Sequence, residues 1–138
     1  TKPKTISCSY HFSKYELQTL RKTFKRLKIG ISINPENFNL QYIKNIRNLI
    51  NVIYFDMNVY KKSSIKTYSL NKCIKQIKSI KNLSIPVFIG GGINGVKAKQ
   101  IINLVKPDGI DVSRSLKNTK NIISSKKLKN FLKEIAVA

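Results

Sequence analysis

The sequence predicts an α/β fold in which about five parallel strands alternate with helices. Short apolar segments, rich in Ile, Val and Phe, recur roughly every 25–30 residues along the chain. Between them lie lysine-rich stretches whose apolar residues have the spacing of amphipathic helices. Strands that alternate with helices in this way form a parallel sheet with right-handed crossovers. The pattern fits a (β/α) barrel or a doubly wound sheet and does not separate the two.

Each expected strand has the continuous apolar composition of a strand that is buried on both faces. The expected strands are Thr5–Tyr10, Ile29–Ile33, Val52–Asp56, Pro86–Ile89 and Gly109–Val112.

Five helices are expected between and after these strands. Asn34 followed by Pro35 predicts the N-cap and first turn of the second helix, which would place Glu36 on a solvated helix face. The other helices are marked by Leu17 and Leu20, by Ile74, Ile77 and Ile80, by Ile101, Ile102 and Val105, and by Leu128, Phe131, Leu132 and Ile135. We find no linker and expect residues 1–138 to form a single domain.

The charge is unbalanced, with 27 Lys and Arg against 6 Asp and Glu and a net charge of +21. Such an excess would suit a nucleic-acid or anionic-membrane partner. However, the lysines are spread over every helix rather than clustered with aromatics, and Lys, Ile and Asn dominate as in an AT-rich coding sequence. We therefore attribute the charge to coding bias and expect neither partner.

The cysteines and the hydropathy indicate the cellular compartment of the protein. Cys8 and Cys73 lie far apart without metal-ligand spacing, and both are expected to be structural. No signal peptide precedes them, and no apolar run approaches the ~20 residues that span a bilayer. The sequence thus predicts a cytoplasmic protein without a metal site.

Few residues are available for acid–base chemistry. Asp56 follows the apolar run Val-Ile-Tyr-Phe, and so lies at the carboxyl end of its strand, the edge at which parallel α/β folds bind ligands. It is a candidate general acid, with the capping of the next loop as the alternative. Asp111, in the segment GIDVS, is equally suited to bind a ligand or to form structural hydrogen bonds. His11 ends the first strand and is a candidate for a catalytic or a packing role.

The strongest local signal is the turn Gly90-Gly91-Gly92, which follows a strand and precedes a helix. Three glycines leave backbone N–H groups free to approach an anion at the helix N-terminus. Ser113 and Arg114 follow the last strand and could bind the same phosphate. Barrel enzymes commonly build one phosphate site from the loops after their last two strands.

These two segments resemble phosphoribosylanthranilate isomerase, the (β/α)8 enzyme of tryptophan biosynthesis. IPVFIGGGING is similar to a segment that ends in the family's AGGL turn, and GIDVSRS to its GVDVSSGVE strand end. VIYFD looks like the sixth-strand segment that ends in the catalytic aspartate, and SYHF is weakly similar to the fourth-strand QLHG. The resemblance implies a partial (β/α)8 TIM barrel that covers strands 4–8 of the family fold.

The resemblance also implies a reaction, the Amadori rearrangement of N-(5-phosphoribosyl)anthranilate without a cofactor. It gives Asp56 the role of the general acid that protonates the ribose ring oxygen. It places Asp111 beside the anthranilate, matches His11 to the family's histidine, and assigns the substrate phosphate to the two loops. The phosphate-binding residues would be Gly90, Gly91, Gly92, Ser113 and Arg114.

The sequence departs from the family in two places. The strand that carries the family's catalytic cysteine is absent from this chain. Whether the chain is active by itself is therefore open. The sixth loop lacks the family's glycine-rich turn and reads VYKKSSIKTYS. The chain could be a fragment, a decayed enzyme or one part of a split barrel, completed by a partner chain or an N-terminal segment.

Two other functions remain open. FIGGGIN and GISINPE are similar to segments of ribulose-phosphate epimerases, although one histidine cannot supply the metal ligands of that family. The alternative outside enzymes is a non-catalytic basic binding protein.

Overall fold

The computed structural model describes residues 4–9 and 12–136, and it confirms the predicted α/β fold. Five parallel strands form one sheet, each hydrogen-bonded to its neighbour in the order β1-β2-β3-β6-β7. The sheet does not close on itself, so β1 and β7 are its edges. The strands are β1 (Thr5–Ser9), β2 (Lys28–Ile33), β3 (Val52–Asp56), β6 (Val87–Gly90) and β7 (Gly109–Ile110).

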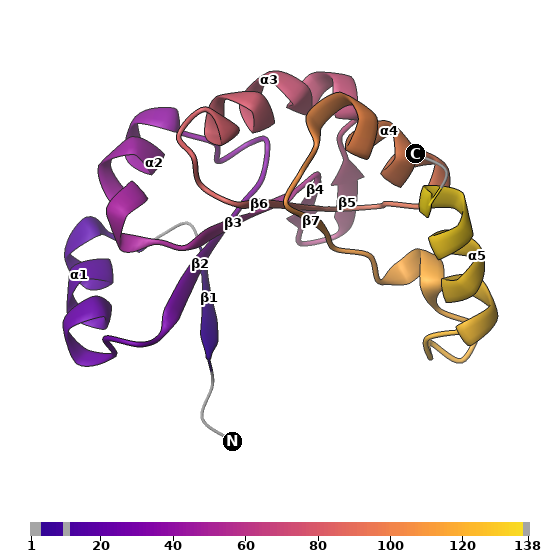
Figure 1. The fold of residues 1–138 in the computed structure, drawn as a ribbon, viewed down its shortest axis with the longest axis horizontal. Coiled ribbons are helices and arrows are strands. Elements are labelled where there is room, and N and C mark those ends of the chain that lie inside the picture. Colours follow the sequence, from indigo (N-terminus) through magenta and orange to yellow (C-terminus); the bar gives the residue numbers. More distant parts are fainter. Residues whose placement is uncertain (1–3, 10–11, 137–138) are drawn as a thin grey trace.

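The helices lie along the outer side of the curved sheet (Figure 1). α1 to α4 follow the strands in an arc, and α5 packs beside α4 at the β7 end of the sheet. They are α1 (Lys14–Thr23), α2 (Leu40–Ile46), α3 (Leu70–Lys81), α4 (Gly95–Val105) and α5 (Ser125–Ala136), with short 3₁₀ helices η1 (Arg47–Leu49) and η2 (Arg114–Leu116). Among the described residues, no helix is both long and apolar enough to span a bilayer.

Successive side chains along each strand face opposite sides of the sheet. Ile31 lies opposite Ile53 in the ladder, and both are fully buried in the core beneath the helices. The intervening side chains face the inner side, where Tyr54 lies opposite Phe88 and the two rings meet edge to face with centroids 5.7 Å apart. Because Asp56 lies two residues after Tyr54, it also belongs to the inner side.

The predicted start of the second helix is wrong. α2 begins at Leu40, and its N-cap is Asn39, whose side chain accepts a hydrogen bond from the Tyr42 N–H at 3.0 Å. Asn34 instead closes a turn, because its side-chain oxygen accepts the N–H groups of Glu36 and Asn37. Asn-Pro suits such a turn as well as a helix start, and local sequence does not distinguish them. Glu36 consequently lies in the β2–α2 loop, not on a helix.

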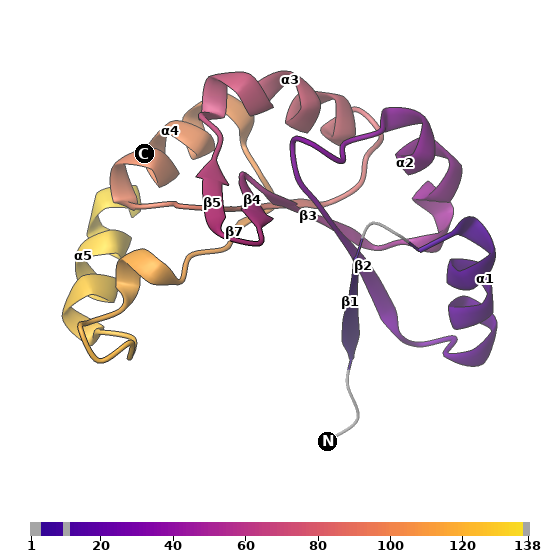
Figure 2. The same ribbon diagram turned by 180° about the vertical axis from the view of Figure 1, so that it is seen from behind.

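A β-hairpin not expected from the sequence follows β3 directly. β4 (Asn58–Lys61) and β5 (Ser64–Thr67) pair antiparallel and form a separate two-stranded sheet. The hairpin lies between β3 and α3, near the carboxyl ends of the parallel strands (Figure 2). It includes most of the segment VYKKSSIKTYS, for which the sequence predicts no strand.

Candidate functional site

Asp56, Gly90 and Asp111 form a row across three neighbouring strands. Asp56 lies opposite Gly90 in the β3–β6 ladder, and Asp111 follows Ile110, which lies opposite Ile89. A Cβ atom at Gly90 would be 3.5 Å from the Asp111 carboxylate oxygen Oδ2. The glycine therefore leaves open the space between two acidic side chains at the carboxyl edge of the sheet.

The Asp56 carboxylate is half-buried and hydrogen-bonded. Its Oδ1 accepts the backbone N–H of Asn58 at 2.9 Å. Burial raises the pKa of Asp56, and the negative charge of Asp111 adds to the rise, while the Asn58 N–H, Arg114 and the Tyr60 hydroxyl oppose it. A raised pKa is the property that a carboxyl group needs in order to hold a proton near neutral pH and donate it.

Close contacts at Gly91 exclude any side chain from the glycine turn. Gly91 and Gly92 have φ angles of +96° and +63°, which side chains disfavour. A Cβ at Gly91 would lie 2.4 Å from Asp56 Oδ1 and 2.6 Å from the backbone nitrogen atoms of Met57 and Asn58. The turn must therefore be bare so that it can pack against the end of β3. The same conformation exposes the N–H of Gly92, which no hydrogen bond among the described residues uses.

The second loop reaches the first one through η2. Ser115 Oγ donates to the carbonyl oxygen of Ile93 at 2.7 Å, which fixes the loop after β7 to the start of α4. The backbone N–H groups of Ser113 and Arg114 have no acceptor within the described part of the chain. α4 begins at Gly95 beside them, and the Glu134 carboxylate lies against Gly95 at this positive end of the helix dipole. Free N–H groups, a guanidinium and a helix N-terminus are the components of an anion site.

These elements enclose one pocket of about 410 Å³, a volume suited to a small ligand. The carboxylates of Asp56 and Asp111 and the guanidinium of Arg114 all line it. It brings together predicted site residues from three strand ends and adds residues from the hairpin, but Gly90 is not among its lining residues. The lining residues are Asp56, Asn58, Tyr60, Gly91, Gly92, Ile93, Asn94, Asp111, Ser113, Arg114 and Ser115.

The other candidates do not join this pocket. His11 lies outside the described residues. Cys8 is opposite Ile31 in the ladder and is buried on the helix side of the sheet, and Cys73 is fully buried in α3, as expected for structural cysteines. Burial raises the pKa of the Cys73 thiol to about 11. No group of three His, Cys, Asp or Glu side chains suited to a metal occurs among the described residues.

The site predicted from the sequence did not include five of the pocket residues, which are Asn58 and Tyr60 of the hairpin and Ile93, Asn94 and Ser115 of the two loops. Asn58 is only 2% exposed, and its Oδ1 accepts the Thr67 hydroxyl at 2.7 Å across the hairpin. The Tyr60 hydroxyl lies 3.4 Å from Asn58 Nδ2. The sequence gives little sign of this hairpin, because the connecting Lys62 and Ser63 lack the Gly or Asn typical of a tight hairpin turn.

The chain is similar to known proteins in its fold. No protein-family profile and no curated sequence matches it. Among solved structures, N-(5′-phosphoribosyl)anthranilate isomerase from Pyrococcus furiosus is similar with a TM-score of 0.66 and 19% identity, over 98% of this chain and 63% of that one. The fold of the chain is thus that of TIM-barrel-like proteins, with the sheet left open.

Two further structures share the fold. KGPDC from Streptococcus mutans has a TM-score of 0.74 and 12% identity, over 97% of this chain and 62% of that one. Thiamine phosphate pyrophosphorylase from Pyrococcus furiosus has a TM-score of 0.62 and 17% identity, over 97% of this chain and 58% of that one. The chain spans less than two thirds of the length of each of these three proteins.

Proposed function

We propose that the pocket binds the phosphate ester of a small sugar. The observation that carries the proposal is that two carboxylates, a guanidinium and the glycine turn line one pocket. The free N–H groups of Gly92 and Ser113, with Arg114 and the start of α4, suit a phosphate. Asp56 and Asp111, in the same pocket, suit hydroxyl or amine donors. A phosphosugar carries both kinds of group in one small molecule.

The enzyme reaction we propose is the isomerisation of a phosphoribosyl amine, as in phosphoribosylanthranilate isomerase. Asp56 is the general acid that protonates the ribose ring oxygen, and its raised pKa favours the protonated form this step requires. The resemblance of VIYFD, IPVFIGGGING and GIDVS supports this assignment. The name of one structural neighbour contains a phosphoribosyl compound and that of another a phosphate, which supports the ligand class.

We also propose that further strands pair with β1 and β7. Both are edges of a parallel sheet, and unpaired edges expose N–H and C=O groups that proteins normally cover. At the β7 end, Leu132 of α5 is 51% exposed. Either a partner chain or a segment N-terminal to Thr1 would supply these strands.

Titration calorimetry with ribose 5-phosphate, inorganic phosphate and ribose tests the ligand class. We expect saturable binding of ribose 5-phosphate at one site, weaker binding of phosphate and no binding of ribose. Gly91→Asp should abolish binding, because a carboxylate would enter the space held by Asp56. Equal binding of all three compounds, or none, would contradict the proposal.

A further inference from the structure

The hairpin that carries Asn58 and Tyr60 has little holding its outer part. Every residue of β5 is exposed, and so are the two residues of β4 nearest the turn. An isolated two-stranded hairpin is marginally stable in water. The base of the hairpin is fixed by the buried Asn58 and by the Tyr68 N–H, which donates to the Met57 carbonyl oxygen at 2.8 Å. Its outer part needs another attachment to hold Tyr60 at the pocket.

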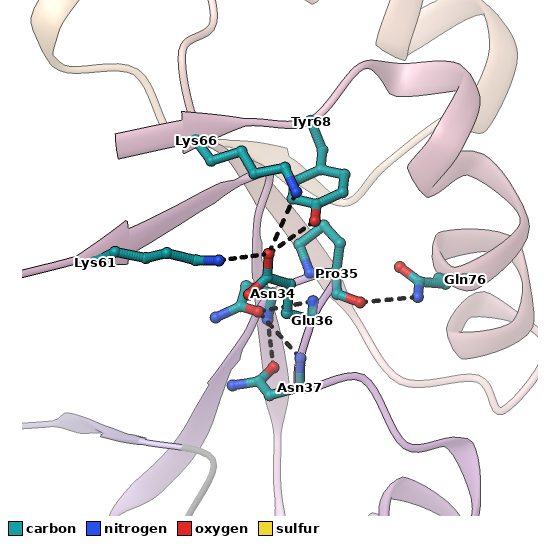
Figure 3. Close-up of polar contacts among 8 residues, drawn as sticks. All are labelled: Asn34, Pro35, Glu36, Asn37, Lys61, Lys66, Tyr68 and Gln76. Carbon is teal, nitrogen blue, oxygen red and sulfur yellow. Dashed lines mark hydrogen bonds and ion pairs between the residues drawn. The ribbon is translucent and has the colours of Figure 1, made fainter. Parts of the chain in front are cut away.

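Glu36 supplies that attachment (Figure 3). One oxygen, Oε1, is 3.4 Å from Lys61 Nζ on β4 and 3.6 Å from Lys66 Nζ on β5. The same oxygen accepts the Tyr68 hydroxyl at 2.8 Å. Lys66 also lies over the Tyr68 ring, 4.6 Å from its centroid. A single carboxylate thus contacts both strands of the hairpin and the residue that follows them.

Glu36 is itself held in place by its loop. Its backbone N–H donates to Asn34 Oδ1 at 2.9 Å, and the Asn34 N–H donates to Asn37 Oδ1 at 2.7 Å. The loop is also tied to α3, because Gln76 Nε2 donates to the Pro35 carbonyl oxygen at 3.2 Å. The β2–α2 loop therefore holds Glu36 in place as the attachment point of the hairpin.

The overall charge makes this carboxylate hard to replace. The chain has only 6 acidic residues against 27 basic ones, and two of the three ion pairs in the described part of the chain belong to Glu36. Without it, Lys61 and Lys66 would repel one another with no counter-charge between them. Exposed ion pairs are individually weak, so the loss should loosen the hairpin without unfolding the domain.

We propose that Glu36 is a positioning residue for the pocket, which fixes the hairpin so that Tyr60 and Asn58 contact the sugar part of a bound phosphosugar. The proposal rests on the proposed function and extends it to specificity. Phosphate itself is bound by the loops after β6 and β7, which Glu36 does not touch. Loss of Glu36 should therefore weaken sugar recognition and leave phosphate recognition intact.

Glu36→Gln is the decisive variant, because it removes the charge and keeps an acceptor for the Tyr68 hydroxyl. Glu16→Gln is the matched control, because Glu16 is a distant glutamate whose capping role at α1 a glutamine can retain. We expect Glu36→Gln to weaken ribose 5-phosphate binding at least about fivefold and to change inorganic phosphate binding by less than about twofold. Glu16→Gln should change neither.

Amide hydrogen exchange measured by NMR provides a readout that does not depend on a ligand. In Glu36→Gln, the amides of β4 and β5 should exchange faster, while those of β3 and β6 remain as in the wild type. Unchanged exchange in the hairpin, or equal loss of affinity for phosphate and ribose 5-phosphate, would overturn the role of Glu36. If the wild type bound no phosphate compound, the proposed function would fail, and the proposed role of Glu36 at the pocket with it; the exchange rates would still decide whether Glu36 fixes the hairpin.

Discussion

The glycine turn and the hairpin border the same pocket, and they differ in how the sequence encodes them. Gly91 is required by its own φ of +96° and by atoms of Asp56, Met57 and Asn58 that leave no room for a Cβ. The hairpin is held by contacts with residues distant in sequence, above all Glu36, which lies 25 residues before Lys61. The glycine turn thus restricts the residue type at a single position, whereas the hairpin depends on matched pairs of residues. The following experiments test this difference.

Gly91→Ala should have the largest effect. The positive φ and the contacts with Asp56 and the Met57 amide together should cost about 3 kcal/mol or more of the free energy of unfolding. Gly90→Ala is the control, since its Cβ would meet Asp111 at an ordinary 3.5 Å, and we expect a cost below about 1 kcal/mol. Urea denaturation of the two variants measures both. Similar costs would refute the steric explanation of the turn.

Asn58→Ala should have an intermediate effect. It removes the buried acceptor of the Thr67 hydroxyl at the base of the hairpin, and we expect a loss of about 1–2 kcal/mol. Thr67→Val removes the other partner. If this hydrogen bond holds the base, a double-mutant cycle will give a coupling of about 0.5 kcal/mol or more, and strictly additive losses would count against it.

Asp56→Asn should change the pH dependence of stability. Because the folded-state pKa of Asp56 is raised, the wild type is favoured when Asp56 is protonated and loses this advantage as the pH rises through that pKa. Asn retains an acceptor for the Asn58 N–H and does not ionise. The variant should therefore gain stability relative to the wild type from acidic to neutral pH. Parallel stability curves from pH 4 to pH 8 would show that the Asp56 pKa is not raised.

The smallest expected effect is faster amide exchange in the hairpin at acidic pH. The Tyr68 hydroxyl, followed by Lys61 and Lys66, lowers the pKa of Glu36 below its usual value. This stabilisation is complete above the unfolded-state pKa and is lost as the pH falls through the lower folded-state value. Amide exchange in β5, corrected for the intrinsic pH dependence, should thus rise in this acidic range, and the rise should be absent in Glu36→Gln. The same rise in both proteins would assign it to another group.

The parts that sequence could predict are those with local causes. The order of the strands, the turn at Gly90–Gly92 and the position of Asp56 at a strand end all follow from composition and order along the chain. The expected burial of every strand on both faces is wrong for β1, where Ile6 is 38% exposed at the edge of the sheet. The helix start at Asn34 was wrong because Asn-Pro also suits a turn, and only the Asn39 cap distinguishes the two. The hairpin was not predicted because the Asn58–Thr67 and Glu36 contacts that hold it leave no local pattern.

The central claim is that the pocket, and not the general positive charge, binds phosphate esters. Arg114→Gln and Lys120→Gln remove one cation each, from the pocket and from an exposed loop outside it. Calorimetric titration with ribose 5-phosphate at about 0.15 M salt, where surface charges are largely screened beyond about 8 Å, compares them directly. We expect Arg114→Gln to weaken binding at least about tenfold and Lys120→Gln to leave it unchanged. Equal, small losses in both variants would contradict the site.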